Sequence, residues 1–334
     1  MQQQGKGIMI AGSLIADVFY TVDTYPNQGM LTKIRDNDWN IGGTGNIILD
    51  LAKLDSSLPI YVSAIVGDDD NGRMLEKTLK AYPNIRLDHL RRDGQTSITI
   101  VMNAEDTKQR TFFFQSGGSS LYGEEYIDWD HLDVDIFHLE YLLLLDKVDA
   151  PDPEYVTHGA RILHKAQQLG MKTSVDMVSE QSDRAKRVVT AALRYTDYCA
   201  INEVEAEAVT GIPLKIDGEF CEERIQQALR AIADMGVSTW VVIHSPEMGY
   251  GYDCKADAFV KVPSLSLPKG YIKGSTGAGD AYCSGILYGA YRGWELEQAM
   301  ILGTASAACS LSEMNGTDGL RPLDDVIKLY QQLR

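Results

Sequence analysis

The segment 274–280, Gly-Ser-Thr-Gly-Ala-Gly-Asp, places small residues and one carboxylate directly ahead of the apolar stretch 281–290. This pattern predicts a turn at the start of a helix, where backbone N–H groups lack partners and the helix dipole adds partial positive charge. Such a turn binds phosphate through the main chain. A carboxylate at the same turn would repel a phosphate. Its presence is explained if Asp280 takes a proton from a hydroxyl group while the turn stabilises a phosphoryl group during its transfer. The segment therefore favours a kinase.

The glycine-rich segments have three other interpretations, of which one stays open and two are excluded. The segment 274–280 can also be only a turn with Asp280 as a helix cap, and this alternative stays open from the segment alone. A Walker-type loop needs a lysine after its last glycine, and none follows Gly279. A dinucleotide-binding fingerprint fails because Gly5 and Gly7 are followed by Ile10 where a third glycine is required. Two common nucleotide-binding loops are thus excluded.

Composition is typical of a soluble globular protein. The chain has 334 residues, of which 44% are hydrophobic and 23% charged, enough for one large α/β domain. A net charge of −16 disfavours nucleic acid and anionic membranes as partners, because both bind basic surfaces. Five scattered cysteines without a Cys-x-x-Cys pair fit a reducing compartment. We see no apolar run long enough for a signal peptide or a membrane span and expect a cytoplasmic protein.

Apolar runs and amphipathic patterns alternate along the chain. We expect strands at 8–11, 60–66, 134–139, 172–176, 197–201 and 239–243. We expect helices at 154–169, 183–195, 203–210, 222–235, 280–292, 295–311 and 322–333. This alternation predicts an α/β fold with a parallel sheet covered by helices on both faces. Two β-rich segments, 31–40 and 95–115, indicate a small antiparallel excursion from that scaffold.

Polar residues collect where the expected strands end. Asp17 follows the first strand, Glu140 and Asp176 end later strands, and Asn202 and Glu205 follow another. Each alone is more often a helix cap or a turn former. In a parallel sheet, however, ligands bind at the carboxyl ends of the strands. The common position of these residues therefore indicates a ligand site.

With these residues in place, the chain resembles the ribokinase, or PfkB, family of carbohydrate and nucleoside kinases over essentially its whole length. Three motifs occur in the family's order: Gly42-Gly43 with Asn46, Asn202-x-x-Glu205, and the C-terminal signature at 277–280. The resemblance implies a ribokinase-like three-layer α/β/α fold with a mostly parallel central sheet. It also implies one domain over 1–334, with a small β lid from about 14–40 and 95–115 closing over the substrate.

The resemblance implies roles for the residues of the acceptor side. Asp280 would be the base that deprotonates the acceptor hydroxyl. The anion hole around the transferring phosphate would consist of the amides of Gly277, Ala278 and Gly279. The acceptor would bind to Asp17, Gly42, Gly43, Asn46 and Glu140. Glycines allow close approach of a sugar ring, and an asparagine offers both a donor and an acceptor.

On the nucleotide side, the resemblance implies ATP and Mg²⁺ as cofactors. Mg²⁺ would be organised by Asn202 and Glu205, mostly through water. The nucleotide would contact Ser245, Gly249, Gly277 and Gly279. The chain departs from the family pattern twice: Gly274 stands where an aspartate of a monovalent-cation site is usual, which leaves K⁺ dependence open. Pro246 removes a backbone donor near the ATP phosphates.

The sequence does not identify a single substrate. We expect transfer to a hydroxyl group, a primary one first, of a neutral sugar or sugar-like polyol. A nucleoside is the second choice, and a sugar acid or sugar phosphate the third, because the cations of the β-rich segments, Arg110 among them, form no compact cluster. A catalytically silent sugar-binding protein on the same scaffold is the alternative of a different class. The edge strands of the lid suggest a homodimer.

Overall fold

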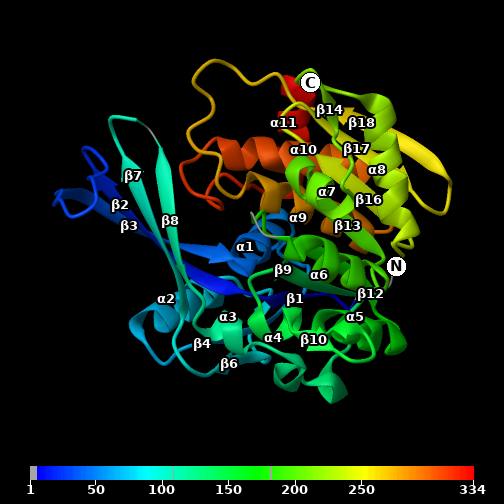
Figure 1. Cartoon of the computed structure of the whole chain (residues 1–334), viewed down its shortest axis with the longest axis horizontal. Helices are drawn as coiled ribbons and strands as arrows, with labels where there is room; N and C mark the ends of the chain where they lie inside the picture. The colour runs from blue at the N-terminus through cyan, green and yellow to red at the C-terminus, as the bar shows by residue number, and fades with distance from the viewer. Residues whose placement is uncertain (1–5, 108, 181–182) are drawn as a thin grey trace.

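Strands that are continuous apolar runs form the central sheet. The computed structural model describes residues 6–107, 109–180 and 183–334, and in that part of the chain the sheet has ten strands (Figure 1). They are β1 (Ile8–Gly12), β4 (Ile60–Val66), β5 (Ile85–Arg86), β6 (Leu90–Arg92), β9 (Ile136–Leu142), β12 (Lys172–Met177), β13 (Tyr198–Asn202), β16 (Trp240–His244), β17 (Met248–Asp253) and β18 (Ala258–Pro263). Residues 1–5, 108 and 181–182 of the expected domain 1–334 lie outside this description.

The sheet is parallel except at one edge. Its order is β18-β17-β16-β13-β12-β9-β1-β4-β5, and β6 also pairs with β4. Neighbours from β16 to β5 run parallel, whereas β17 and β18 are antiparallel additions. All of β1 is buried, as expected for a strand covered on both faces. The mostly parallel central sheet is confirmed.

Helices cover both faces of the sheet over two apolar cores. On one core lie α1 (Thr44–Leu54), α2 (Asp70–Lys80), α9 (Ala278–Tyr291), α10 (Leu296–Leu311) and α11 (Leu323–Leu333). On the other lie α5 (His158–Gln168), α6 (Arg184–Leu193), α7 (Glu203–Thr210) and α8 (Glu222–Asp234). Short helices lie at α3 (Gly118–Leu121) and α4 (Asp146–Asp149), with single 3-10 turns at Glu124–Tyr126 and Trp129–His131. The three-layer α/β/α architecture is confirmed.

A second sheet extends from the body of the molecule (Figure 1). Its order is β3-β2-β7-β8, with β2 (Leu14–Val22), β3 (Ile34–Gly43), β7 (Ser97–Ala104) and β8 (Arg110–Gln115). The two β-rich segments contribute β3, β7 and β8, and β2 comes from the chain before them. The expected antiparallel arrangement is wrong for the central pair, β2 and β7. The hairpins β2–β3 and β7–β8 are antiparallel, and β2 and β7 join them in parallel. The reason is that both strands leave the main sheet in the same direction.

Most element bounds agree with the sequence patterns to within a few residues, and α5 shows why one differs. The helix expected from 154 begins at His158, because β10 (Pro151–Asp152) first pairs with β11 (Val156–Thr157). The Thr157 hydroxyl then accepts a hydrogen bond from the Ala160 N–H and caps the helix. A second small hairpin joins β14 (Lys215–Ile216) to β15 (Glu219–Phe220). Within the described ranges, no helix combines the length and the apolar character needed to cross a bilayer.

Candidate active site

Gly277 allows the chain to turn into α9. Its φ of 78° is left-handed, and a Cβ atom there would lie 2.4 Å from the Cα atom of Gly316. Only glycine fits this turn without strain. The Ala278 N–H donates to the Ser275 carbonyl at a long 3.4 Å, whereas no described hydrogen bond uses the N–H of Gly277 or Gly279. Both glycines line a cavity of about 270 Å³, so the turn offers free amides to a ligand.

Asp280 lies in the first turn of α9 and is 8% exposed. Its Oδ2 accepts a hydrogen bond of 2.7 Å from Asn46 Nδ2, and its Oδ1 accepts one of 2.9 Å from the Tyr141 hydroxyl. Burial raises the pKa of Asp280, and the hydrogen bonds from Asn46 and Tyr141 oppose the rise. Two donors therefore orient this carboxylate, as a base next to an acceptor hydroxyl requires.

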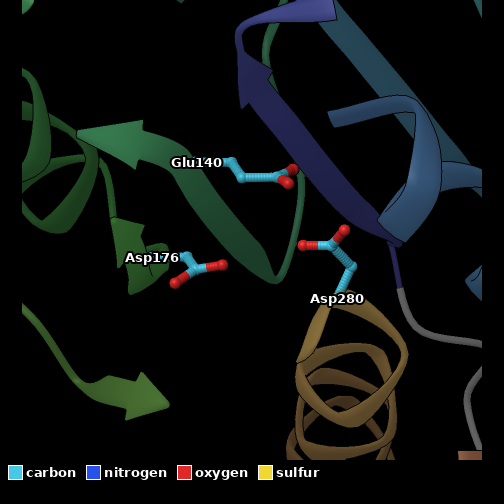
Figure 2. A group of neighbouring side chains, drawn as sticks. All are labelled: Glu140, Asp176 and Asp280. Carbon is cyan, nitrogen blue, oxygen red and sulfur yellow. The ribbon is translucent and has the colours of Figure 1, made fainter. Parts of the chain in front are cut away.

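Two further carboxyl groups face Asp280 (Figure 2). Glu140 comes from β9 and Asp176 from β12, and oxygens of all three residues lie within 4.8 Å of one another. In the described part of the chain, neither oxygen of Glu140 has a hydrogen-bond partner. Burial, followed by the charges of neighbouring carboxylates, raises the pKa of Glu140 and of Asp176. Hydroxyl groups of a polyol would satisfy these oxygens as donors.

The two glycines of the N-terminal motif, Gly42 and Gly43, lie in close packing contacts, and Gly42 packs against Asp17. Asp17 lies in β2, and a Cβ atom on Gly42 would be 2.3 Å from its Oδ2 atom. Gly43 has a φ of 59°, and a Cβ atom there would be 2.0 Å from the Ser13 carbonyl oxygen. Burial raises the pKa of Asp17 to about 7, the Thr99 hydrogen bond opposes the rise, and the charge of Asp280 adds to it. Glycines are thus required here by close packing.

Asn202 and Glu205 form a capping box at the start of α7. Asn202 Oδ1 accepts from the Glu205 N–H, and Glu205 Oε2 accepts from the Asn202 N–H, both at 2.9 Å. Ser179 Oγ donates to Glu205 Oε1 at 2.7 Å. Burial raises the pKa of Glu205 to about 7 against these hydrogen bonds. Both residues line the 270 Å³ cavity, and their side-chain oxygens already accept the hydrogen bonds described above.

A larger cavity of about 720 Å³ adjoins the turn on its other side. Part of its wall is apolar and consists of Leu265, Leu267, Ile272, Ala307, Ala308 and Leu311. His244, Asn202 and Gly279 line both this cavity and the smaller one. The His244 ring stacks on Tyr282 at 4.9 Å, and burial lowers its pKa to about 4, so it is neutral near pH 7. An apolar slot thus leads to a polar, amide-lined end.

The two residues expected beside the nucleotide, Ser245 in the turn after β16 and Gly249 on β17, have different surroundings. Ser245 lines the large cavity together with Pro246. Gly249 packs against Tyr282, because a Cβ atom there would be 2.4 Å from the phenol oxygen, and it is not among the residues of the cavity wall. Of the two residues, only Ser245 therefore contributes to the wall of this cavity.

Sequence reasoning missed two contacts of the site. Tyr141 comes directly after Glu140 at a strand end, and this position is the signal in the sequence that could have indicated it. Arg110, on β8, donates from Nη1 to Thr276 Oγ1 in the turn before α9. These bonds join residues 139 and 166 positions apart, respectively. Arg110 thus brings a cation from the second sheet to the turn before α9.

The geometry matches a known family of proteins. A family model described as pfkB family carbohydrate kinase matches residues 6–322. The chain belongs to this family.

Individual relatives in the family are distant. A 5-dehydro-2-deoxygluconokinase from Geobacillus thermodenitrificans is 29% identical over 28% of this chain and 27% of its own length, so the match spans about a quarter of that relative. A ribokinase from Arabidopsis thaliana is 21% identical over 97% of this chain and 81% of its own length. The structure of Arabidopsis thaliana ribokinase complexed with ribose and ATP has a TM-score of 0.80, 18% identity, and coverage of 97% of this chain and 98% of that one. The fold is therefore ribokinase-like.

Proposed function

We propose that this protein transfers the terminal phosphoryl group of ATP to a hydroxyl group, a primary one, of a sugar or sugar-like polyol. One observation supports this best: Asp280 lies between a carboxylate-rich acceptor side and a turn with free amides that opens into a large cavity. A base on one side and an anion site on the other are what phosphoryl transfer to an alcohol needs.

The acceptor side suits a neutral polyhydroxy compound. Asp17 and Glu140 would accept hydrogen bonds from sugar hydroxyls, and Asn46 would hold both the base and a neighbouring hydroxyl. The missing side chain of Gly42 leaves room for the Asp17 carboxylate, and that of Gly43 leaves room for the Ser13 carbonyl. The second sheet would act as the lid that closes over the sugar and excludes water.

The phosphate side suits ATP. The apolar slot of the 720 Å³ cavity would take the adenine ring, with Ser245 on the polar side. The phosphates would then reach the amides of Gly277 and Gly279, with Ala278 able to join once its long bond to Ser275 is released. Arg110 would neutralise charge on the transferring group.

Mg²⁺ would accompany the ATP phosphates and neutralise their charge when bound. The donors near them fit this ion, because Mg²⁺ prefers oxygen ligands and keeps several waters. The oxygens of Asn202 and Glu205 are occupied by the capping box, so contact through water suits them better than direct contact. The described cysteines are all free, in keeping with a cytoplasmic enzyme.

The test is phosphoryl transfer measured over a panel of sugars, polyols, sugar acids and nucleosides with Mg-ATP. We expect turnover with a neutral sugar or polyol. Changing Asp280 to Asn should lower kcat by about 10²- to 10⁴-fold, because a general base is lost, while ATP and sugar still bind. Turnover only with nucleosides would move the substrate to that class. Ligand binding without turnover across the panel would instead favour a silent sugar-binding protein.

A further inference from the structure

Tyr141 combines an unusual backbone conformation with a contact to the proposed base. Its φ is 61°, and Leu143 nearby has a φ of 81°, both left-handed values in non-glycine residues near the end of β9. Such conformations are unfavourable for residues with a side chain and persist only where the surroundings hold them, often at functional sites. The surroundings of Tyr141 therefore hold its backbone in a conformation that places the side chain.

The Tyr141 side chain reaches the carboxylate of Asp280. Its hydroxyl donates to Oδ1 at 2.9 Å, while Asn46 donates to the opposite oxygen at 2.7 Å. Two donors on opposite oxygens fix the plane of the carboxylate. Tyr141 also lines the 270 Å³ cavity together with Asp176 and Gly279, so its hydroxyl lies next to the place of reaction.

The surroundings of Asp280 make this donor important. The charge of Asp280 acts on carboxyl groups from five elements, which are Asp17 on β2, Asp50 on α1, Glu140 on β9, Asp176 on β12 and Glu205 on α7. The pKa of each is raised first by burial and in part by the charge of Asp280. His244 on β16 is neutral near pH 7, with its pKa lowered by burial to about 4. So many carboxyl groups cannot all ionise together.

We propose that Tyr141 is a positioning residue whose hydrogen bond selects Asp280 as the carboxyl group that keeps its negative charge and aims it at the acceptor hydroxyl. The proposal rests on the proposed function, in which Asp280 is the base. Asn46 supplies the second bond, but in the proposed function its amide would also bind the sugar. Tyr141 is the donor that belongs to the base alone.

The test is the Tyr141→Phe variant of the full chain, which removes one hydroxyl group and keeps the ring and the backbone. We expect kcat to fall about tenfold while KM for the sugar and for ATP stays within about twofold. The acidic limb of the pH profile of kcat should move to higher pH, because a donor that stabilises the carboxylate is lost. Tyr61→Phe, a half-buried tyrosine on β4, is the matched control and should behave as wild type.

Two outcomes would overturn the proposal: an unchanged kcat with an unchanged pH profile, or a raised KM for the sugar with unchanged kcat. A ¹³C NMR titration of aspartate-labelled protein gives a second measurement that needs no turnover. The Asp280 carboxyl should titrate at higher pH in Tyr141→Phe than in wild type, and equal titration would also overturn the proposal. If the wild type showed no kinase activity, the proposed function would fail while the titration still tested Tyr141.

Discussion

At the level of single residues, the site contains a carboxylate that lies where a glycine has no side chain. Gly42 has no left-handed φ, and its lack of a side chain matters because Asp17 lies directly over it. We expect Gly42→Ala to displace the Asp17 carboxylate and raise KM for the sugar about tenfold, with KM for ATP unchanged. Isothermal titration with the sugar checks this. Unchanged sugar affinity would show that Asp17 does not contact the substrate.

A second prediction at the level of single residues concerns the effect of the buried Asp17 carboxyl group on the free energy of unfolding. The pKa of its carboxyl is raised from 3.8 to about 7, so between these values the folded chain binds more protons than the unfolded chain. Stability contributed by this group therefore falls as the pH rises through that window. Asp17→Asn should raise the free energy of unfolding by about 2–4 kcal/mol at pH 8 and change it little at pH 4.

Urea denaturation at the two pH values measures the Asp17 effect. The exposed Asp38 on β3 is the matched position, and Asp38→Asn should leave stability unchanged at both. If Asp17→Asn were no more stable than wild type at pH 8, the carboxyl would not be a buried charge.

Among the structural elements, the loop 312–318 between α10 and α11 supports the anion-binding turn. Gly316 packs against Gly277, and the carbonyls of residues 313 and 314 lie against Gly274. Lys53, on α1, donates from Nζ to the Thr317 carbonyl at 2.6 Å and anchors the loop. The turn that would hold the phosphate is thus supported by a helix from the other end of the chain.

Removing the Lys53 ammonium should loosen this loop. Lys53→Met keeps the apolar stem but loses a charge-assisted hydrogen bond, and we expect a loss of about 1–3 kcal/mol in unfolding free energy. Amide hydrogen exchange of residues 312–318 should become faster. Lys80→Met on α2, an exposed lysine paired with Glu76, is the control and should change neither measurement. Unaltered exchange in Lys53→Met would assign the loop's order to packing alone.

For the whole molecule, the second sheet presents an apolar edge. Phe112, Phe113 and Phe114 on β8 are 59%, 49% and 39% exposed, and β8 is an edge strand. Exposed edges with large apolar side chains favour pairing with another chain. We propose that two copies associate through this sheet, which would also shield the lid.

The dimer proposal predicts that Phe112→Lys combined with Phe114→Lys gives a monomer, because both residues lie on one face of β8. Sedimentation velocity of the wild type and the variant measures this. Ile216→Lys changes an exposed apolar residue on the separate β14–β15 hairpin and should leave the dimer intact. A monomeric wild type at all concentrations would remove the proposal.

Local patterns in the sequence predicted many of the elements and the motifs of the candidate site, whereas α2, β17 and β18 were not expected. The α7 helix at 203–210 was expected with these bounds, because hydrophobic periodicity and capping residues are local signals. The turn at Gly277 and the pairing of Asp280 with a helix start were equally local. The family pattern added the roles of Asp17, Asn46 and Glu140.

The contacts between side chains far apart in the sequence could be known from the folded chain alone. The parallel pairing of β2 with β7, the bond from Tyr141 to Asp280 and the reach of Arg110 to Thr276 all join distant parts of the chain. The same holds for the five carboxyl groups that interact with Asp280 and for the apolar wall of the 720 Å³ cavity. The physical reason is that local patterns specify elements, whereas sheet order and helix packing set the distances between them, and those distances determine charge, hydrogen bonding and pKa.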